Sequence, residues 1–240
     1  MEGFSYSDIF ATKGIEYLIV ITFLVLLIPF WRILNKPLEL ARKFRIPRGK
    51  LTLNELEIPQ GLYYGPNHTW MYLEKSGTAK IGLDDLLLHL TGEVSCSLPR
   101  HHGERITKGE TLAFIHQEDK QLQILSPVSG TITQANKILM ENQIEINEDP
   151  YGNGWLYKIK PDNWILDSQK CYFANDAIVW AGKELSKIKD FLAETQKKYS
   201  HESSLVILQD GGELSDYTLA PLSKQIWNDF ETKFLLFPEI

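Results

Sequence analysis

The sequence predicts a mainly β fold with flanking helices, one N-terminal transmembrane helix and a C-terminal α/β extension. Three observations support this prediction. Short apolar runs separated by turn residues recur between residues 69 and 159, a long apolar run fills residues 15–34, and a helical repeat begins after residue 173. Short strands spaced by about ten residues are typical of a small β-barrel or sandwich.

The first element is the apolar run IEYLIVITFLVLLIPFWRIL, residues 15–34. About 20 helical residues cross the roughly 30 Å hydrocarbon layer of a bilayer, so this run predicts a transmembrane helix. Tyr17 and Trp31 lie near its two ends, where amphipathic rings favour the membrane interface. A buried core helix is the alternative. A signal peptide does not fit, because residues 1–14 lack a basic stretch and no small-residue cleavage site follows.

The residues after this run set its predicted orientation. Basic residues outnumber acids there, with one acid, Glu39, against Arg32, Lys36, Arg42, Lys43, Arg45, Arg48 and Lys50. Such an excess marks the cytoplasmic side of a membrane helix. We therefore expect a single-pass protein of the cytoplasmic membrane, with residues 1–35 forming the outside N-terminus and the span, and residues 36–61 a basic juxtamembrane linker. The same basic run could also bind anionic lipid.

Seven strands and one short helix are expected in the β-rich middle. The strands are predicted at residues 69–73, 78–82, 93–98, 111–115, 121–125, 130–133 and 155–159. The helix is predicted at residues 84–92, because Asp84 or Asp85 can cap its start and Gly92 can end it. Asp84 and Asp85 are neighbours in sequence, so their side chains diverge and do not resemble a catalytic pair.

A helical stripe dominates the C-terminal extension, residues 165–240. Its members alternate in steps of three and four: Ile178, Ala181, Leu185, Ile188 and Leu192. This spacing predicts a helix that packs on another surface, either the core of its own chain or a partner helix. The five residues are therefore our candidates for partner binding. A strand at residues 204–208, a turn at 210–212 and a helix from about Pro221 to Phe237 follow.

Composition narrows the class of function. The net charge of −6 does not fit a nucleic-acid binder. Cys96 and Cys171 stand far apart and outside any CxxC spacing, so we expect free thiols. The six histidines show no metal-ligand spacing, and neither a phosphate-binding loop nor a nucleophile motif occurs. The sequence therefore predicts no metal site and no enzyme.

Several separated motifs resemble one known family, the H protein of the glycine cleavage system. The motifs are HTW at 68–70, KIGLDD at 80–85, GEVSCSLPRHHGERITKGE at 92–110, SPVSG at 126–130 and NEDPYGNGW at 147–155. The resemblance covers residues 62–164 and is weakest around 137–143. It implies a lipoyl-domain-like β-sandwich, a hammerhead of two short sheets with small helices.

In that family a lysine on an exposed hairpin turn carries lipoate through an amide bond. Counting without a gap from Gly109 and from Ser126 places Asp119, in HQEDK, at the position of the family lysine. Lys120 stands one residue later, and a shift of one residue in a hairpin turns a side chain to another face. We therefore interpret Lys120 as a solvated turn lysine without lipoate. The alternative is lipoate on Lys120 after a rearrangement of the turn.

These observations lead to two main hypotheses of function, and a soluble component of the glycine cleavage system, without a membrane helix, is a third possibility. The first is a non-catalytic, membrane-anchored subunit that uses the H-protein-like domain as a docking or scaffold module in a cytoplasm-facing complex. Its partners would be other subunits of that complex, and it would need no cofactor. The second is a membrane-tethered lipoyl carrier with lipoate on Lys120.

Overall fold

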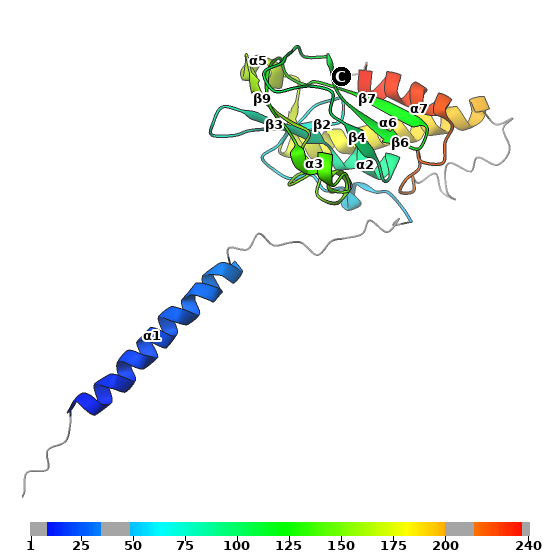
Figure 1. The fold of residues 1–240 in the computed structure, drawn as a ribbon. Helices are drawn as coiled ribbons and strands as arrows, with labels where there is room; N and C mark the ends of the chain where they lie inside the picture. Colours follow the sequence, from blue (N-terminus) through cyan, green and yellow to red (C-terminus); the bar gives the residue numbers. More distant parts are fainter. Residues whose placement is uncertain (1–8, 35–48, 200–213, 237–240) are drawn as a thin grey trace, which may run out of the picture. The chain divides into compact units, whose positions relative to one another are not determined.

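The computed structural model describes residues 9–34, 49–199 and 214–236, which fall in two units, Met1–Lys43 and Phe44–Ile240 (Figure 1). The first unit contains the helix α1, Ile9–Leu34, which begins earlier than predicted. The side chains described between Tyr17 and Trp31 are exposed. Among the described residues, no helix is both long and apolar enough to cross a membrane. The helix is thus confirmed, whereas the predicted span gains no support.

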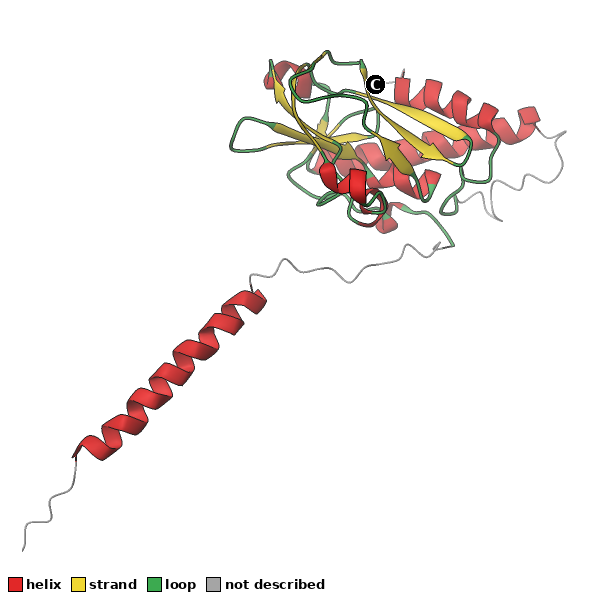
Figure 2. Ribbon diagram, in the orientation of Figure 1, coloured by secondary structure: helices red, strands yellow, loops and turns green. Residues whose placement is uncertain are grey.

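The second unit contains two antiparallel sheets (Figures 1 and 2). The larger has the strand order β10-β1-β2-β3-β9-β8-β5, and the smaller has the order β4-β6-β7. The strands of the larger sheet are β1 (Tyr63–Tyr64), β2 (Thr69–Leu73), β3 (Ala79–Leu83), β5 (Arg105–Ile106), β8 (Gly130–Ala135), β9 (Tyr157–Pro161) and β10 (Tyr172–Phe173). The strands of the smaller sheet are β4 (Ser95–Ser97), β6 (Thr111–Gln117) and β7 (Lys120–Leu125). All seven predicted strands are therefore present, with shifted ends.

The helix α2, Asp85–Thr91, forms as the sequence predicts. Asp84 is its N-cap and accepts a hydrogen bond from the backbone N–H of Leu87 (2.9 Å). Gly92 follows the last turn with φ 77°, a conformation that residues with a Cβ resist. Because all seven residues of α2 are buried, this helix lies in the interior of the second unit.

Several short elements escaped prediction. The segment around residues 137–143 forms α3 (Lys137–Glu141) and α4 (Glu145–Glu148), and α3 is capped by Asn136. A further helix, α5 (Trp164–Ser168), starts at Asn163, whose side chain accepts from the N–H of Leu166 (3.1 Å). Helices this short lack a repeating apolar pattern, so periodicity does not reveal them.

The predicted linker, residues 36–61, needs correction at its C-terminal end. Leu51 is fully buried and pairs with Leu214, and a turn of 3-10 helix, η1, spans Leu53–Glu55. These residues pack on the folded unit because they supply apolar side chains to its core. The other predicted features of residues 35–48 lie outside the described residues.

The C-terminal extension is part of the same compact unit as the β-rich middle. Helix α6 spans Asn175–Tyr199, α7 spans Lys224–Phe230, and a π-helix, η2, spans Glu231–Leu236. Leu185, Ile188 and Leu192 of α6 join the main apolar core together with side chains from the sheets. The predicted boundary between residues 164 and 165 therefore does not separate two packing units. The predicted strand at 204–208 and turn at 210–212 lie outside the described residues.

Candidate functional site

The hairpin between β6 and β7 is the candidate site that the sequence singled out. Gln117 pairs with Lys120, so the turn consists of two residues, Glu118 and Asp119. Glu118 adopts φ 54°, in the left-handed region that tight hairpin turns use. Both turn residues are exposed, and Gln117 fixes the base of the hairpin by donating to the carbonyl of Thr91 (2.6 Å).

Lys120 lies at the first position of β7 and is only 6% exposed. Its ammonium donates a hydrogen bond to the carbonyl of Ala220 and lies 5.1 Å from the ring centroid of Trp227. A carbonyl and an aromatic face are both favourable partners for a buried cation. The prediction that Lys120 is a solvated turn lysine was wrong, because a segment 100 residues later in the chain covers it.

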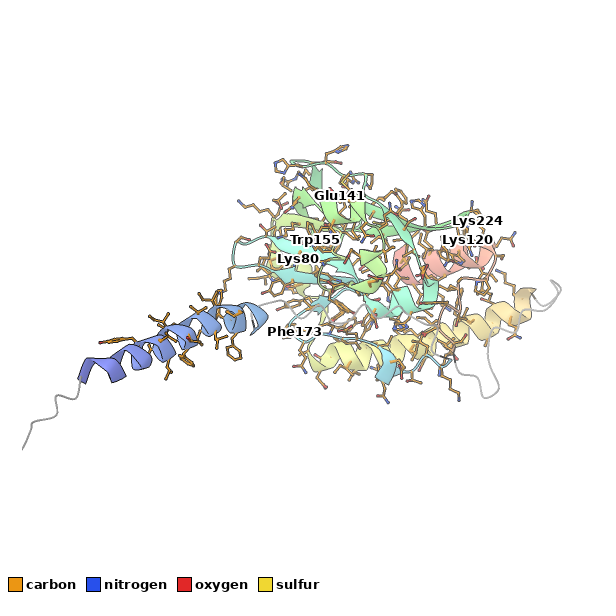
Figure 3. All side chains as sticks on the ribbon, turned by 60° about the horizontal axis from the view of Figure 1, so that its bottom comes forward. Lys80, Lys120, Glu141, Trp155, Phe173 and Lys224 are labelled. Carbon is orange, nitrogen blue, oxygen red and sulfur yellow. The ribbon has the colours of Figure 1, made fainter. Side chains whose placement is uncertain are left out.

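That covering segment, residues 214–236, is fixed at three further places. The backbone N–H groups of Tyr217 and Leu219 donate to the carbonyls of His89 (2.7 Å) and Leu90 (2.9 Å). A carboxylate oxygen of Glu231 accepts from the backbone N–H of Gln123 in β7 (2.5 Å). We call residues 214–236 the C-terminal cover. Figure 3 labels Lys120 beside Lys224, the first residue of α7 in this cover.

The hairpin does not fit an amide-linked lipoate. The lysine amine has to be accessible for acylation, but the Nζ of Lys120 is enclosed between Ala220 and Trp227. Asp119 is exposed at the turn, but a carboxylate has no amine to acylate. Each of the two requirements, exposure and an amine, is met by a different residue.

Two buried histidines, His68 and His89, connect α2 to the rest of the unit, and their contacts were not predicted. Nδ1 of His68 lies 2.9 Å from Asp84 Oδ2, and its Nε2 lies 4.0 Å from Glu184 Oε1 of α6. His89 lies between Asp85 (3.1 Å) and Asp216 of the C-terminal cover (2.7 Å). The adjacent carboxylates of Asp84 and Asp85 thus diverge, as expected, and each serves a different histidine.

The charge state of His68 depends on these carboxylates. Burial by itself disfavours the charged imidazolium, but the charge of Asp84, its hydrogen bond and the charge of Glu184 together outweigh that effect. The pKa of His68 is therefore raised above its ordinary value. The imidazole ring thus lies between Asp84, the N-cap of α2, and Glu184 of α6. Among the described residues, no group of three or more side chains that could hold a metal ion occurs.

The helical stripe of α6 lies in the interior of its own chain. Ala181, Leu185, Ile188 and Leu192 are 2%, 6%, 0% and 0% exposed, and Ile178 is half-buried. A partner has no access to the four buried side chains, so their assignment as partner-binding residues needs correction. The core alternative holds for them. Cys96 and Cys171 are both free thiols, as predicted.

Together the two sheets and the β6–β7 hairpin define a lipoyl-type carrier module with flanking helices. The family model for the glycine cleavage H-protein matches residues 62–176. The chain is 32% identical over 126 residues to a probable glycine cleavage system H protein of Pyrococcus abyssi, covering 50% of this chain and 93% of that protein. The chain therefore belongs to the glycine cleavage H-protein family.

Two further proteins are similar to parts of this chain. The glycine cleavage system H protein of Dinoroseobacter shibae is 39% identical over 98 residues, which cover 41% of this chain and 80% of that protein. A crystal structure of an H protein from Mycobacterium marinum covers 44% of this chain and 87% of its own, with 26% identity and a TM-score of 0.41.

Proposed function

We propose that this protein is a docking or scaffold module that has kept the H-protein fold and works without lipoate. It would act as a non-catalytic, membrane-attached subunit of a cytoplasm-facing complex, with other subunits as partners. The observation that carries the proposal is the burial of Lys120 beneath the C-terminal cover.

The contacts of the C-terminal cover favour a state in which Lys120 stays buried. It encloses the lysine through a carbonyl and an indole ring, satisfies the backbone of β7 through Glu231, and reaches α2 through Asp216. These contacts come from four different positions in the cover. Exposing Lys120 would break several of them together, which favours a static module over a carrier whose arm has to travel.

Membrane attachment is a separate part of the proposal. The described side chains of α1 from Leu18 to Phe30 include many large apolar groups, and these are exposed. In the sequence, basic residues follow this helix. An apolar helix next to a basic stretch favours association with a bilayer surface or interior. Attachment of this kind would raise the effective concentration of the module near a membrane partner.

Intact mass spectrometry of the full chain tests the cofactor part. The chain would be produced in cells that lipoylate a co-expressed H protein with a lysine at its hairpin tip. We expect that control to carry lipoate and this chain to be unmodified. Lipoate on Lys120 would overturn the docking proposal in favour of the carrier alternative.

The variant Asp119→Lys provides a matched control for the same experiment. It places an amine at the exposed turn and leaves Lys120 buried. Modification of this variant alone would show that the modifying enzyme reaches the hairpin and that burial protects Lys120. Carbonate extraction of membranes, compared with a chain lacking residues 9–34, tests attachment; release of the full chain by carbonate would exclude an embedded helix.

A further inference from the structure

The strand β4 forms one outer edge of the smaller sheet, because β6 pairs with it on one side only. At Val94, the residue before this strand, the backbone groups on this edge already have hydrogen-bond partners. Both backbone groups of Val94 bind the side-chain amide of Asn147: its N–H donates to Oδ1 (3.2 Å), and its carbonyl accepts from Nδ2 (2.8 Å). Asn147 thus binds Val94 in the way that a neighbouring strand would.

The next outward-facing backbone groups belong to Cys96. Backbone groups alternate between the two sides of a strand, so those of Cys96 point to the same edge as those of Val94. An edge strand with outward N–H and C=O groups is a template for an added strand. Asn147 therefore blocks strand pairing at Val94, at the N-terminal end of β4. The edge from Cys96 toward Leu98 is not blocked by Asn147.

A groove of about 260 Å³ lies along this continuation. Its lining consists of Cys96, Ser97, Leu98, Leu139, Met140 and Gln143. Burial raises the pKa of the Cys96 thiol to about 11, so the thiol is neutral at physiological pH and contributes an apolar wall. Ile138, Met140 and Ile144, on and just after α3, are 42%, 67% and 58% exposed. Of these three, Met140 lines the groove, and a large exposed apolar side chain beside a groove is typical of a protein-binding surface.

The charges of the segment around α3, which forms one wall of the groove, are mainly negative. Glu141 ends α3 and is exposed, and Glu145 is partly exposed. Lys137 is an exposed cation of the same segment. This excess of carboxylates complements a basic ligand. It disfavours a second copy of this chain pairing β4 with β4, because that arrangement would bring like charges together.

We infer that β4 and α3 form a docking site for an extended, basic segment of a partner protein. The segment adds as a strand beside Cys96, places an apolar side chain in the groove and sets Lys or Arg side chains against Glu141 and Glu145. This inference deepens the docking role proposed above and rests on it. Alternating apolar and basic residues meet these requirements, because successive side chains of a strand point to opposite faces.

The test uses the full chain and a six-residue peptide of alternating Val and Lys, blocked at both ends and labelled for fluorescence anisotropy. We expect saturable binding that weakens as salt is raised. Two altered peptides should lose it: one with Glu in place of Lys, and one with N-methyl groups on the amides that pair with β4. Equal binding of either altered peptide, or no saturable binding of the first, would overturn the inference.

Variants on the exposed surface locate the site without disturbing the core. Met140→Ser and Glu141→Lys should each weaken binding by about tenfold. The matched controls are Ile165→Ser on α5 and Glu194→Lys on α6, which should leave binding unchanged. Equal effects of site and control variants would place the peptide elsewhere. The readout is independent of lipoate on Lys120, so failure of this site and failure of the lipoate-free proposal can be told apart.

Discussion

The two edges of the smaller sheet differ in how much of each is covered by other parts of the chain. At the β7 edge, Glu231 occupies the N–H of Gln123, and Trp227 lies over Lys120. At the β4 edge, Asn147 occupies one residue only, and a groove follows it. Because an uncovered strand edge invites pairing with other chains, proteins commonly cover it. The C-terminal cover of the chain covers the β7 edge, whereas the β4 edge is bordered by a groove.

This difference separates the hairpin that the family resemblance singles out from the candidate docking site. Family members of ordinary length match only the part of the chain around the two sheets. The C-terminal cover lies beyond that match and encloses the lysine nearest to the hairpin tip. The β4 edge lies within the match, next to the segment where the resemblance is weakest.

Trp227→Ala should have the largest effect, since it removes the centre of the cover. Trp227 is fully buried, and its indole N–H donates to the carbonyl of Leu219 (2.7 Å). We expect a loss of about 3–5 kcal/mol in the free energy of unfolding, measured by urea denaturation. Ile165→Ala, at a position 74% exposed, is the control. A loss as small as that of the control would show that the cover is not packed as described.

Lys120→Met should cost less, about 1–3 kcal/mol by the same measurement. The methionine retains much of the packing against Trp227 but leaves the carbonyl of Ala220 without its donor. A result near zero would mean that this carbonyl finds another partner or that the hydrogen bond contributes nothing. Lys75→Met, on an exposed turn of the larger sheet, serves as the matched control.

The pH dependence of stability should show whether charge also holds the C-terminal region in place. The pKa of His68 is raised in the folded state, so its stabilising contribution is complete below about pH 6.5, the ordinary histidine value, and is lost as pH rises through the folded value. The groups facing it are Asp84 and Glu184. We expect His68→Gln to flatten this part of the curve; an unchanged curve would assign the dependence to other groups.

Met140→Ser should have the smallest effect on stability, within about 0.5 kcal/mol. Met140 is 67% exposed at the β4 edge, so little packing is lost. Trp227 belongs to the folded core, whereas the side chain of Met140 is mostly exposed. A large loss from Met140→Ser, seen in thermal unfolding, would mean that this edge is also structural.

The fold could largely be predicted from local signals. The short apolar run Thr69–Leu73 and the caps Asp84 and Gly92 act within a few residues, and the structure has these elements where they were expected. The candidate site could be predicted only in part. The count from Gly109 and Ser126 located the hairpin, but the burial of Lys120 depends on Ala220 and Trp227, which no local pattern connects to it. The histidine–carboxylate pairs were missed for the same reason, since His89 and Asp216 are 127 residues apart.

The contacts of Asp84 and Asp85 with two histidines affect where the chain can be truncated. The family match ends at residue 176, yet the carboxylate of Asp84 shares His68 with Glu184, and Asp85 shares His89 with Asp216. A chain shortened to the family's length would keep both histidines and lose one acidic neighbour of each. We therefore expect a fragment that ends at residue 176 to be less stable than one that extends through the π-helix, which ends at Leu236.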